Sequence, residues 1–484
     1  MSETTSTSPA TTPAAPAWVR DAIAWQVYPL GFCGAPLVRD DLGAAEYGDA
    51  DGANVVHRLG RVTAWLDHLV SLGANVLILN PVFDSVSHGY DTLDHRRLDP
   101  RLGDDADLDA LIEAAHGRGI RVVLDGVFNH VSDRHPIVRR ALADGPGSEA
   151  GARIRWAGEH PYGFEGNDDL VELDLANPAV QDAIVEVMDL WLGRGVDGWR
   201  LDAMYAAGAE AWAPIVARVK AAHPDAWILG EVIHGDYPAF AAASGADSLT
   251  QYELWKAIWS SLHDANLWEL AHALGRHEQF RAPVGAGGHR MVPQTFLGNH
   301  DTTRIASQLP DGRDLAPAIA LLALLPGVPT VYAGDELGVV GVKEERAGGD
   351  DAVRPVFPDS PEALLEAARA GGSTEGLTLL RADAAERILE AHRRLLGLRR
   401  REPWLAEATV RVREETLANG YAEIELTGAG EGGGERLLLA INLGDEDRPA
   451  PGEVLEAVRG ADMLDGVGPA GPGVVPAHGV AVVR

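Results

Sequence analysis

Short runs of consecutive apolar residues alternate with segments of helical periodicity along most of the chain. The run NVLILNPVF, for example, follows a segment in which Val62, Leu66 and Leu69 recur at helical spacing. Continuous apolar strands that alternate with helices are typical of a parallel sheet that is covered on both faces. The pattern predicts eight such strands, near residues 27, 78, 124, 200, 229, 251, 296 and 331.

Eight strand–helix units predict a (β/α)₈ TIM barrel, an α/β fold. The alternative is an open doubly wound sheet, but no glycine-rich phosphate fingerprint follows the first strand. The stretch LAPAIALLALLPGVPTVYAG is the most apolar of the chain, and its prolines and glycines favour a buried helix followed by a buried strand over a membrane span.

Two regions depart from the alternation. Residues 131–171 are rich in Gly, Arg, Asp and Glu without a clear period, which predicts a short subdomain inserted after the third strand. Beyond about residue 400, ATVRVREE, YAEIELTG, RLLLAINLG and HGVAVVR are separated by turn residues. We therefore expect a C-terminal antiparallel β domain.

The expected organisation has five segments, which are a tail, two parts of the barrel, the insert and the β domain. The tail spans residues 1–17, and the two parts of the barrel span 18–130 and 172–399. The insert spans 131–171, and the β domain spans 400–484. The tail is rich in Ser, Thr, Pro and Ala, a composition typical of disorder. It lacks the basic and apolar regions of a secretory signal, so we expect none.

The net charge argues against two classes of partner. The chain has 72 acidic and 41 basic residues, a formal charge of −31. Nucleic-acid phosphates and anionic membrane surfaces both attract basic proteins, so we expect neither as a partner. Cys33 is the single cysteine, which excludes an internal disulfide and fits a reducing compartment; we expect a cytoplasmic protein.

Polar residues concentrate where the predicted strands end, and these strand ends build the active site of such a barrel. They are Asp125, Asn129 and His130 after the third strand, Arg200 and Asp202 on the fourth, Glu231 on the fifth, and Asn299, His300 and Asp301 on the seventh. A lone aspartate at a strand end is commonly a helix cap, and one Arg–Asp pair is commonly an ion pair. Their concentration at strand ends favours catalysis instead.

The carboxylates suggest glycoside chemistry. Arg200 and Asp202 are two residues apart on a strand, so their side chains project to one side, and the guanidinium favours an ionised carboxylate. An ionised, buried carboxylate is what a covalent glycosidic nucleophile requires. Glu231 ends the neighbouring strand, where two carboxyl groups can approach to ~5–5.5 Å, the separation in a retaining glycosidase.

Six segments carry a family resemblance. LDGVFNH, GWRLDA, GEV and FLGNHD, in this order, resemble signature segments of the α-amylase family of glycoside hydrolases. SHGYDTLDHRRLDPRLG and AGGDDAVRPVFP resemble family segments after the second and eighth strands. The resemblance implies that Asp202 is the nucleophile, Glu231 the general acid and then base, and Asp301 the third carboxylate, which grips sugar hydroxyls.

The resemblance also implies a set of substrate-binding residues. They are Tyr90, Asp125, His130, Arg200, His300, Arg354, and either Asp350 or Asp351, with Gln26 as a further candidate. Within this set Tyr90 is expected to stack beneath the sugar, and Asp125 to support the site.

The sequence departs from the family at several positions. Tyr205 and Ala206 stand where many members have Lys-His, and His95 stands where tyrosine is frequent. Asn129 matches a calcium ligand of the family, and Asp168, Asp169 or Asp174 could add oxygens, but Asn129 could equally serve only its own loop. We expect no required cofactor, leave calcium binding open and name no metal ligands.

In the insert, Trp156, His160, Tyr162 and Phe164 could stack on sugars or form a small core.

The segments SLTQYELWKAI and GDELGVVGVKEERAGGDDAVRP are most similar to the cyclomaltodextrinase and neopullulanase branch. That branch usually has an N-terminal β domain that helps it dimerise, which this chain does not show; hydrolases of cyclic maltosyl-maltose resemble the branch without it. We therefore expect hydrolysis of α-1,4 or α-1,6 bonds in small linear or cyclic maltooligosaccharides. Glucan transfer or isomerisation by the same residues, and a non-catalytic sugar-binding barrel, are the alternatives. Whether the protein is a homodimer is left open.

Overall fold

A computed structural model describes residues 15–38, 55–285, 288–346, 348–370, 376–429 and 434–484. The expected disordered tail therefore lies almost entirely outside the described residues. Its last residue, Ala17, begins the short 3₁₀ helix η1 (Ala17–Asp21).

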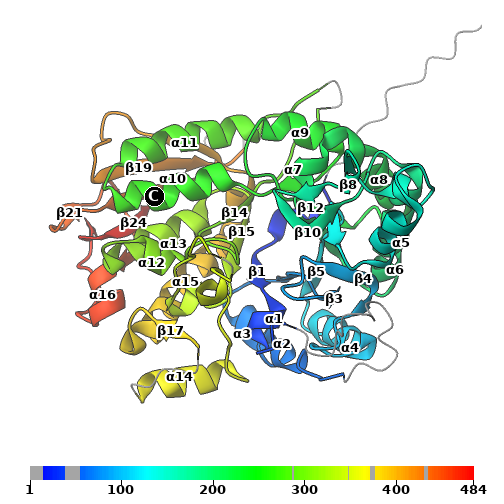
Figure 1. The fold of residues 1–484 in the computed structure, drawn as a ribbon. Helices are drawn as coiled ribbons and strands as arrows, with labels where there is room; N and C mark the ends of the chain where they lie inside the picture. The colour runs from blue at the N-terminus through cyan, green and yellow to red at the C-terminus, as the bar shows by residue number, and fades with distance from the viewer. Residues whose placement is uncertain (1–14, 39–54, 286–287, 347, 371–375, 430–433) are drawn as a thin grey trace, which may run out of the picture.

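Eight parallel strands form a nearly closed barrel (Figure 1). They are β1 (Ala24–Val27), β2 (Val76–Leu79), β5 (Arg121–Gly126), β11 (Gly198–Leu201), β12 (Trp227–Gly230), β13 (Ser248–Leu249), β14 (Gln294–Phe296) and β15 (Val328–Tyr332). Their order is β13-β12-β11-β5-β2-β1-β15-β14, and a parallel bridge from Thr250 to Gln294 joins the two ends. The eight predicted strands and the TIM barrel are thus confirmed, and the open sheet is wrong.

The strands read as continuous apolar runs because both of their faces are buried. In β2, Val76 and Ile78 belong to the apolar cluster inside the barrel, whereas Leu77 and Leu79 belong to the larger cluster between the barrel and its helices. Alternate side chains of a strand point to opposite faces, so a strand with two apolar surroundings needs apolar residues at every position.

Helices that follow the barrel strands along the chain pack around the outside of the barrel (Figure 1). They are α2 (Gly60–Ala64), α3 (Leu66–Ser71), α4 (Asp105–His116), α6 (Pro178–Gly193), α7 (Met204–Ala207), α8 (Ala209–Ala222), α9 (Tyr237–Ser244), α10 (Tyr252–His263), α11 (Leu267–Phe280), α12 (Ile305–Gln308), α13 (Leu315–Leu324) and α15 (Ala385–Arg401). Every residue of α13 is buried and β15 follows it, as the most apolar stretch predicted. Among the described residues, no helix is long and apolar enough to cross a membrane.

Sequence signals explain where individual helices begin. Asn177 caps α6 by accepting the Ala179 N–H, and Pro178 occupies the first helical position. Asp104 caps α4 through a reciprocal pair of hydrogen bonds with Asp107. Each cap fixes the backbone of the first helical turn, and so it helps to orient the apolar face of the helix toward the barrel.

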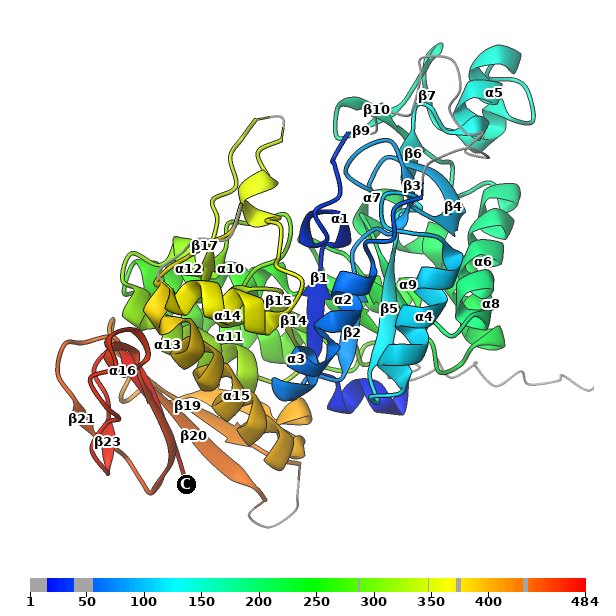
Figure 2. The ribbon, with the colours of Figure 1, turned by 90° about the horizontal axis from the view of Figure 1, so that it is seen from below.

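The inserted subdomain is a small antiparallel sheet with its own apolar core. β6 (His130–Ser132), β10 (Asn167–Glu172) and β9 (Gly163–Phe164) form the sheet, beside a hairpin of β7 (Trp156–Ala157) and β8 (His160–Pro161), and α5 (Pro136–Asp144) packs nearby. Its core residues include Val131, Val138 and Ile154. Figure 2 shows this subdomain at the top, at the same end of the barrel as the hairpin of β3 (Phe83–Ser85) and β4 (Thr92–Leu98).

The C-terminal domain is a five-stranded antiparallel sheet, as expected. Its order is β18 (Thr409–Val412), β19 (Tyr421–Thr427), β20 (Arg436–Asn442), β24 (Gly479–Val483) and β22 (Val454–Arg459). β22 was not predicted, because it is a half-exposed edge strand whose apolar residues are interrupted by charged ones. The sheet lies against α11 and α13, away from the inserted subdomain (Figure 2).

The remaining elements are short. They are α1 (Pro29–Phe32), β16 (Val339–Val340) paired with β17 (Thr378–Leu379), α14 (Pro361–Arg369), β21 (Arg448–Pro449) paired with β23 (Val474–Val475), and α16 (Gly460–Asp465). Of these, α1 directly follows β1, and so it stands at the end of the barrel where the strand-end residues gather.

Candidate active site

The local backbone explains why Asp202 and Glu231 lie next to each other. Asp202 directly follows β11, and Glu231 directly follows the adjacent strand β12. After Asp202 the chain turns sharply, because Ala203 has a φ of 44°, and the Ala203 N–H donates to Glu231 Oε2 at 3.0 Å. The residue before Glu231 is glycine; a Cβ on Gly230 would lie 2.3 Å from the Met204 sulfur.

Arg200 is at the centre of the carboxylate cluster. Its Nη1 donates to Asp125 Oδ1 and Oδ2 at 2.9 and 3.0 Å, and to Asp202 Oδ1 at 2.7 Å. Its Nη2 lies 2.7 Å from Glu231 Oε1. All four side chains are buried. The strand register explains the contact with Asp125, since Arg200 is directly paired with it across β11 and β5.

The electrostatics of the cluster differ from the expectation that the Arg200 guanidinium keeps Asp202 ionised. Burial raises the pKa of Asp202 well above its usual range; Arg200 opposes this rise, and Glu231 and Asp125 add to it. The physical reason is that one guanidinium is shared among three carboxylates, which leaves an excess of negative charge. The cluster therefore retains a proton at Asp202 more readily than an isolated aspartate would.

A second ionic group holds Asp301. His300 Nε2 lies 2.8 Å from Asp301 Oδ2, and Arg354 Nη2 donates to Asp301 Oδ1 at 2.7 Å. Desolvation opposes them, but His300 and Arg354 hold the pKa of Asp301 far below its usual range. Arg354 also contacts Asp350 Oδ2 at 3.0 Å. Of the two aspartates that the sequence left open, Asp350 is therefore the one that joins this group.

Tyr90 connects the two groups. Its hydroxyl donates to Asp125 Oδ2 at 3.1 Å and contacts His300 Nε2, and its ring is stacked on the His300 ring. Asn80 Nδ2 donates to the same Asp125 oxygen at 2.9 Å, and Gln26 Nε2 donates to Asn80 Oδ1 at 3.0 Å. Gln26 thus belongs to the hydrogen-bond network of the site, and it reaches Asp125 only through Asn80.

Sequence reasoning missed Tyr252. Its hydroxyl donates to Glu231 Oε1 at 3.1 Å and accepts from Asn299 Nδ2 at 2.9 Å. Asn299 Oδ1 in turn accepts the Asp301 N–H at 2.9 Å. A signal was present, because Tyr252 follows the predicted sixth strand directly and so stands at the same end of the barrel as the other site residues.

His130 presents a ring nitrogen toward Asp202. Its Nδ1 accepts from Asn129 Nδ2 at 3.3 Å, which leaves the proton on Nε2, and Nε2 lies 4.0 Å from Asp202 Oδ2. Within the described chain, that buried Nε2 has no hydrogen-bond partner. Burial lowers the pKa of His130 to about 3, so the ring is neutral. A sugar hydroxyl at Asp202 could accept from it.

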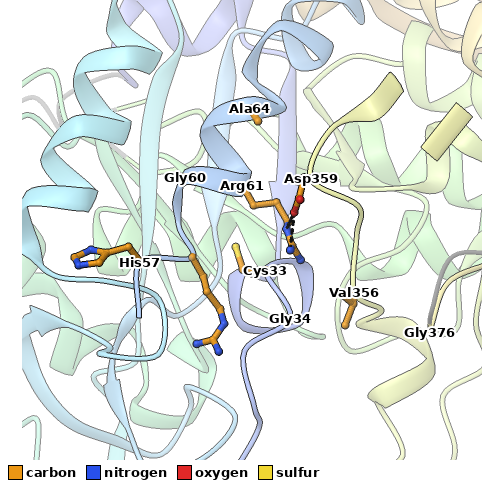
Figure 3. A pocket seen from close by; sticks show the side chains of 10 residues that line it. Cys33, Gly34, His57, Gly60, Arg61, Ala64, Val356, Asp359 and Gly376 are labelled. Carbon is orange, nitrogen blue, oxygen red and sulfur yellow. Dashed lines mark hydrogen bonds and ion pairs between the residues drawn. The ribbon is translucent and has the colours of Figure 1, made fainter. Parts of the chain in front are cut away.

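These side chains surround a cavity of about 340 Å³. It is lined by Tyr90, His130, Phe164, Glu165, Leu170, Asp202, Ala203, Tyr205, Glu231, Ile233, Tyr252, Asp301, Thr302 and Lys343. Of the four aromatic candidates in the insert, Phe164 lines the cavity, whereas Trp156 packs against the insert's own core. A larger hollow of about 710 Å³ lies elsewhere, between α1, α2 and the segment around Asp359, which binds Arg61 there (Figure 3). It contains none of the catalytic candidates.

Two of the side chains considered for calcium serve contacts within their loops. Asn129 donates to His130, and Asp174 accepts the Ala176 N–H. Among the described residues, His57, Asp104 and Asp107 form the one cluster of three His, Cys, Asp or Glu side chains close enough to share an ion. Asp104 and Asp107 already cap α4, which accounts for that cluster.

His95 replaces the frequent family tyrosine without disturbing the site. Its Nε2 lies 2.7 Å from the Val127 carbonyl oxygen, and its ring packs against Phe128. Burial lowers the pKa of His95 to about 4, so it is a neutral donor in the core. A tyrosine hydroxyl would be a donor of the same kind.

Comparisons with known proteins agree with the fold. A family model described as Alpha amylase, catalytic domain, matches residues 44–156 and 156–363. A cyclomaltodextrinase of Bacillus sp is 31% identical over 350 residues, which cover 67% of this chain and 61% of that protein. Cyclic alpha-maltosyl-(1→6)-maltose hydrolase from Arthrobacter globiformis and the debranching enzyme from Nostoc punctiforme superpose with TM-scores of 0.73 and 0.71. Both are 25% identical, with 97% of this chain and 99% of theirs covered.

The chain spans about three fifths of the length of the curated relatives that it matches. The family match, in contrast, covers more than half of this chain and includes most of the barrel strands, the insert, and the residues around Arg200, Glu231 and Asp301. The resemblance drawn from the sequence is confirmed: this chain belongs to the α-amylase family.

Proposed function

We propose that the protein is a retaining glycoside hydrolase that cleaves α-glucosidic bonds in small maltooligosaccharides, linear or cyclic. The observation that carries the proposal is the contact of one guanidinium with two carboxylates on adjacent strand ends, Arg200 with Asp202 and with Glu231. Carboxyl groups held this closely suit the ~5–5.5 Å of a retaining mechanism, whereas an inverting enzyme needs ~6.5–9.5 Å to admit water between them.

The chemistry assigns one role to each carboxylate. Asp202 attacks the anomeric carbon while Glu231 gives its proton to the leaving oxygen, which breaks the glycosidic bond and forms a glycosyl ester. Water, deprotonated by Glu231, then displaces Asp202, and the two inversions give net retention. This first step needs a proton on Glu231 and an ionised Asp202.

The surrounding residues position the sugar and the acid. Asp301 is ionised beside His300 and Arg354, so it can accept hydrogen bonds from sugar hydroxyls. His130 offers its free Nε2–H beside the nucleophile, and Tyr90 lines the cavity. Tyr252 orients Glu231. We propose no cofactor, because each proton and electron pair in these steps belongs to the substrate, water or these side chains.

The substrate class is supported by relatives. The names of the matched proteins include cyclomaltodextrinase and neopullulanase, and the Arthrobacter globiformis hydrolase has been solved in complex with cyclic alpha-maltosyl-(1→6)-maltose. The cavity of about 340 Å³ is near the lower end of the range for small-ligand sites, ~300–1,000 Å³, which favours short glucans. A cytoplasmic location remains a prediction, and the question of a homodimer stays open.

A panel of linear, cyclic and branched α-glucans, with products identified by chromatography and anomers by NMR, tests the proposal. We expect short α-linked products released as the α anomer, by the wild type and not by Asp202→Asn. Release of the β anomer would contradict the mechanism. Predominant transfer products at dilute substrate would instead favour the transferase, and binding without any cleavage would favour a sugar-binding barrel.

A further inference from the structure

The inserted subdomain reaches the cavity through the tip of one hairpin. β9 and β10 are joined by Glu165 and Gly166, whose φ angles are 50° and 81°. Positive φ at both central residues is typical of a type I′ turn, in which Asn, Asp or Gly is preferred. Glutamate is strained in this conformation, and strained residues concentrate at functional sites.

The Glu165 side chain fastens this tip to the barrel. Its Oε1 accepts a hydrogen bond from the Tyr205 hydroxyl at 2.6 Å. Tyr205 belongs to α7, which begins two residues after Asp202, and it occupies the position where many family members have lysine. Beside this contact, the Phe164 ring is stacked on His130 with 4.4 Å between ring centroids. Phe164, Glu165 and Tyr205 are called the hairpin wall below.

The hairpin wall stands on the side of the acid, Glu231. The Tyr205 N–H donates to the Glu231 carbonyl oxygen at 3.3 Å, and the Tyr205 ring is 6.5 Å from the ring of His234. Arg354, which binds Asp301, follows β15, and β15 is opposite β11 in the strand order of the barrel. A leaving group that takes its proton from Glu231 therefore departs toward the hairpin wall.

We propose that the hairpin wall bounds the leaving-group side of the cleft and selects short leaving groups over long ones, an inference that rests on the proposed function. All three of its residues line the cavity. The Glu165 and Tyr205 oxygens bond to each other, so the wall is closed before substrate arrives. A long leaving chain has to break this bond, whereas a short one does not reach it.

Two substitutions remove the hydrogen bond between Glu165 and Tyr205 and are designed to leave the fold intact. Glu165→Asn places a residue that the turn prefers, so it removes the bond to Tyr205 while relieving backbone strain. Tyr205→Phe removes only the hydroxyl and leaves the turn unchanged. Glu159→Asn is the matched control, because Glu159 is exposed in the neighbouring β7–β8 hairpin and does not line the cavity.

The measurement uses maltoheptaose that carries an isotope label at its reducing end, so that each labelled product is the leaving group itself. We expect the wild type and Glu159→Asn to release short labelled fragments. In Glu165→Asn and Tyr205→Phe, the ratio of long to short labelled fragments rises about tenfold. Glu159→Asn leaves both this ratio and the kcat with p-nitrophenyl α-maltoside at the wild-type value.

The same fragment distribution in all four proteins would overturn the role of the hairpin wall and leave the proposed function intact. If Glu165→Asn does not fold, Tyr205→Phe alone decides. A wild-type protein that cleaves neither substrate would overturn the proposed function, and the inference with it.

Discussion

The Tyr252 hydroxyl donates to Glu231 Oε1 at 3.1 Å, the same oxygen that Arg200 Nη2 contacts at 2.7 Å. The other carboxyl oxygen of Glu231 accepts the Ala203 N–H. Glu231 is therefore held at both oxygens by three groups from two segments, the end of β11 and the start of α10. Such preorganisation keeps a catalytic acid aligned with the bond that it protonates.

Tyr252→Phe tests this alignment. Loss of the hydroxyl removes one of the contacts that orient Glu231, so we expect kcat to fall by about 10- to 100-fold while KM changes little. Tyr237→Phe is a suitable control, because the Tyr237 hydroxyl donates to Ile233 O and its side chain does not line the cavity. Equal losses in both variants would assign Tyr252 a general structural role.

Asp202→Gly tests the nucleophile. Without a carboxylate to form the glycosyl ester, we expect turnover to fall by at least ~10⁴-fold. Azide is small enough to occupy the vacated space and attack the anomeric carbon in one displacement. Addition of azide should therefore restore turnover with an activated α-maltoside and produce a β-glycosyl azide. An α-linked azide product would mean that another residue forms the covalent intermediate.

The charge excess at Arg200 predicts a pH-dependent stability. Because the pKa of Asp202 is raised in the folded state, its contribution to stability is fully present below its unfolded pKa of about 4. That contribution is lost as the pH rises toward the raised native value. The side chain in Asp202→Asn cannot ionise, so this variant does not lose stability in the same way as the pH rises. The difference between the Tm of the variant and the Tm of the wild type should therefore increase from pH 4 upward. A Tm difference that is constant with pH would show that Asp202 is not coupled in this way.

Arg354→Ala tests the second ionic group. Arg354 binds Asp301, Asp350 and the His300 carbonyl oxygen, so its removal loosens the carboxylate that is proposed to hold sugar hydroxyls. We expect the kcat/KM for maltooligosaccharides to fall by at least about tenfold. Arg346→Ala, an exposed arginine on the same connecting segment, should leave kcat/KM unchanged. A fall confined to thermal stability would remove Arg354 from the substrate site.

Much of the fold could be predicted because the relevant signals are local. A strand such as β2 is apolar at every position because both of its faces are buried, and this pattern is visible in a short window of sequence. The apolar pattern did not predict strands that are only partly buried, such as the edge strand β22. The site carboxylates were found for the same local reason, since Asp202 and Glu231 end strands whose positions the pattern predicts.

The sequence by itself determined the eight-stranded barrel, the strand-end carboxylates and the family to which the chain belongs. Only the tertiary structure decided how charge is shared in the site: Arg200 contacts three carboxylates, Asp350 rather than Asp351 joins Arg354, and Tyr252 holds Glu231. It alone placed Glu165 of the inserted subdomain against Tyr205 of the barrel. The physical reason is that hydrophobic periodicity is a property of neighbouring residues. Hydrogen bonds between loops, in contrast, exist only once the barrel has closed and brought the strand ends together.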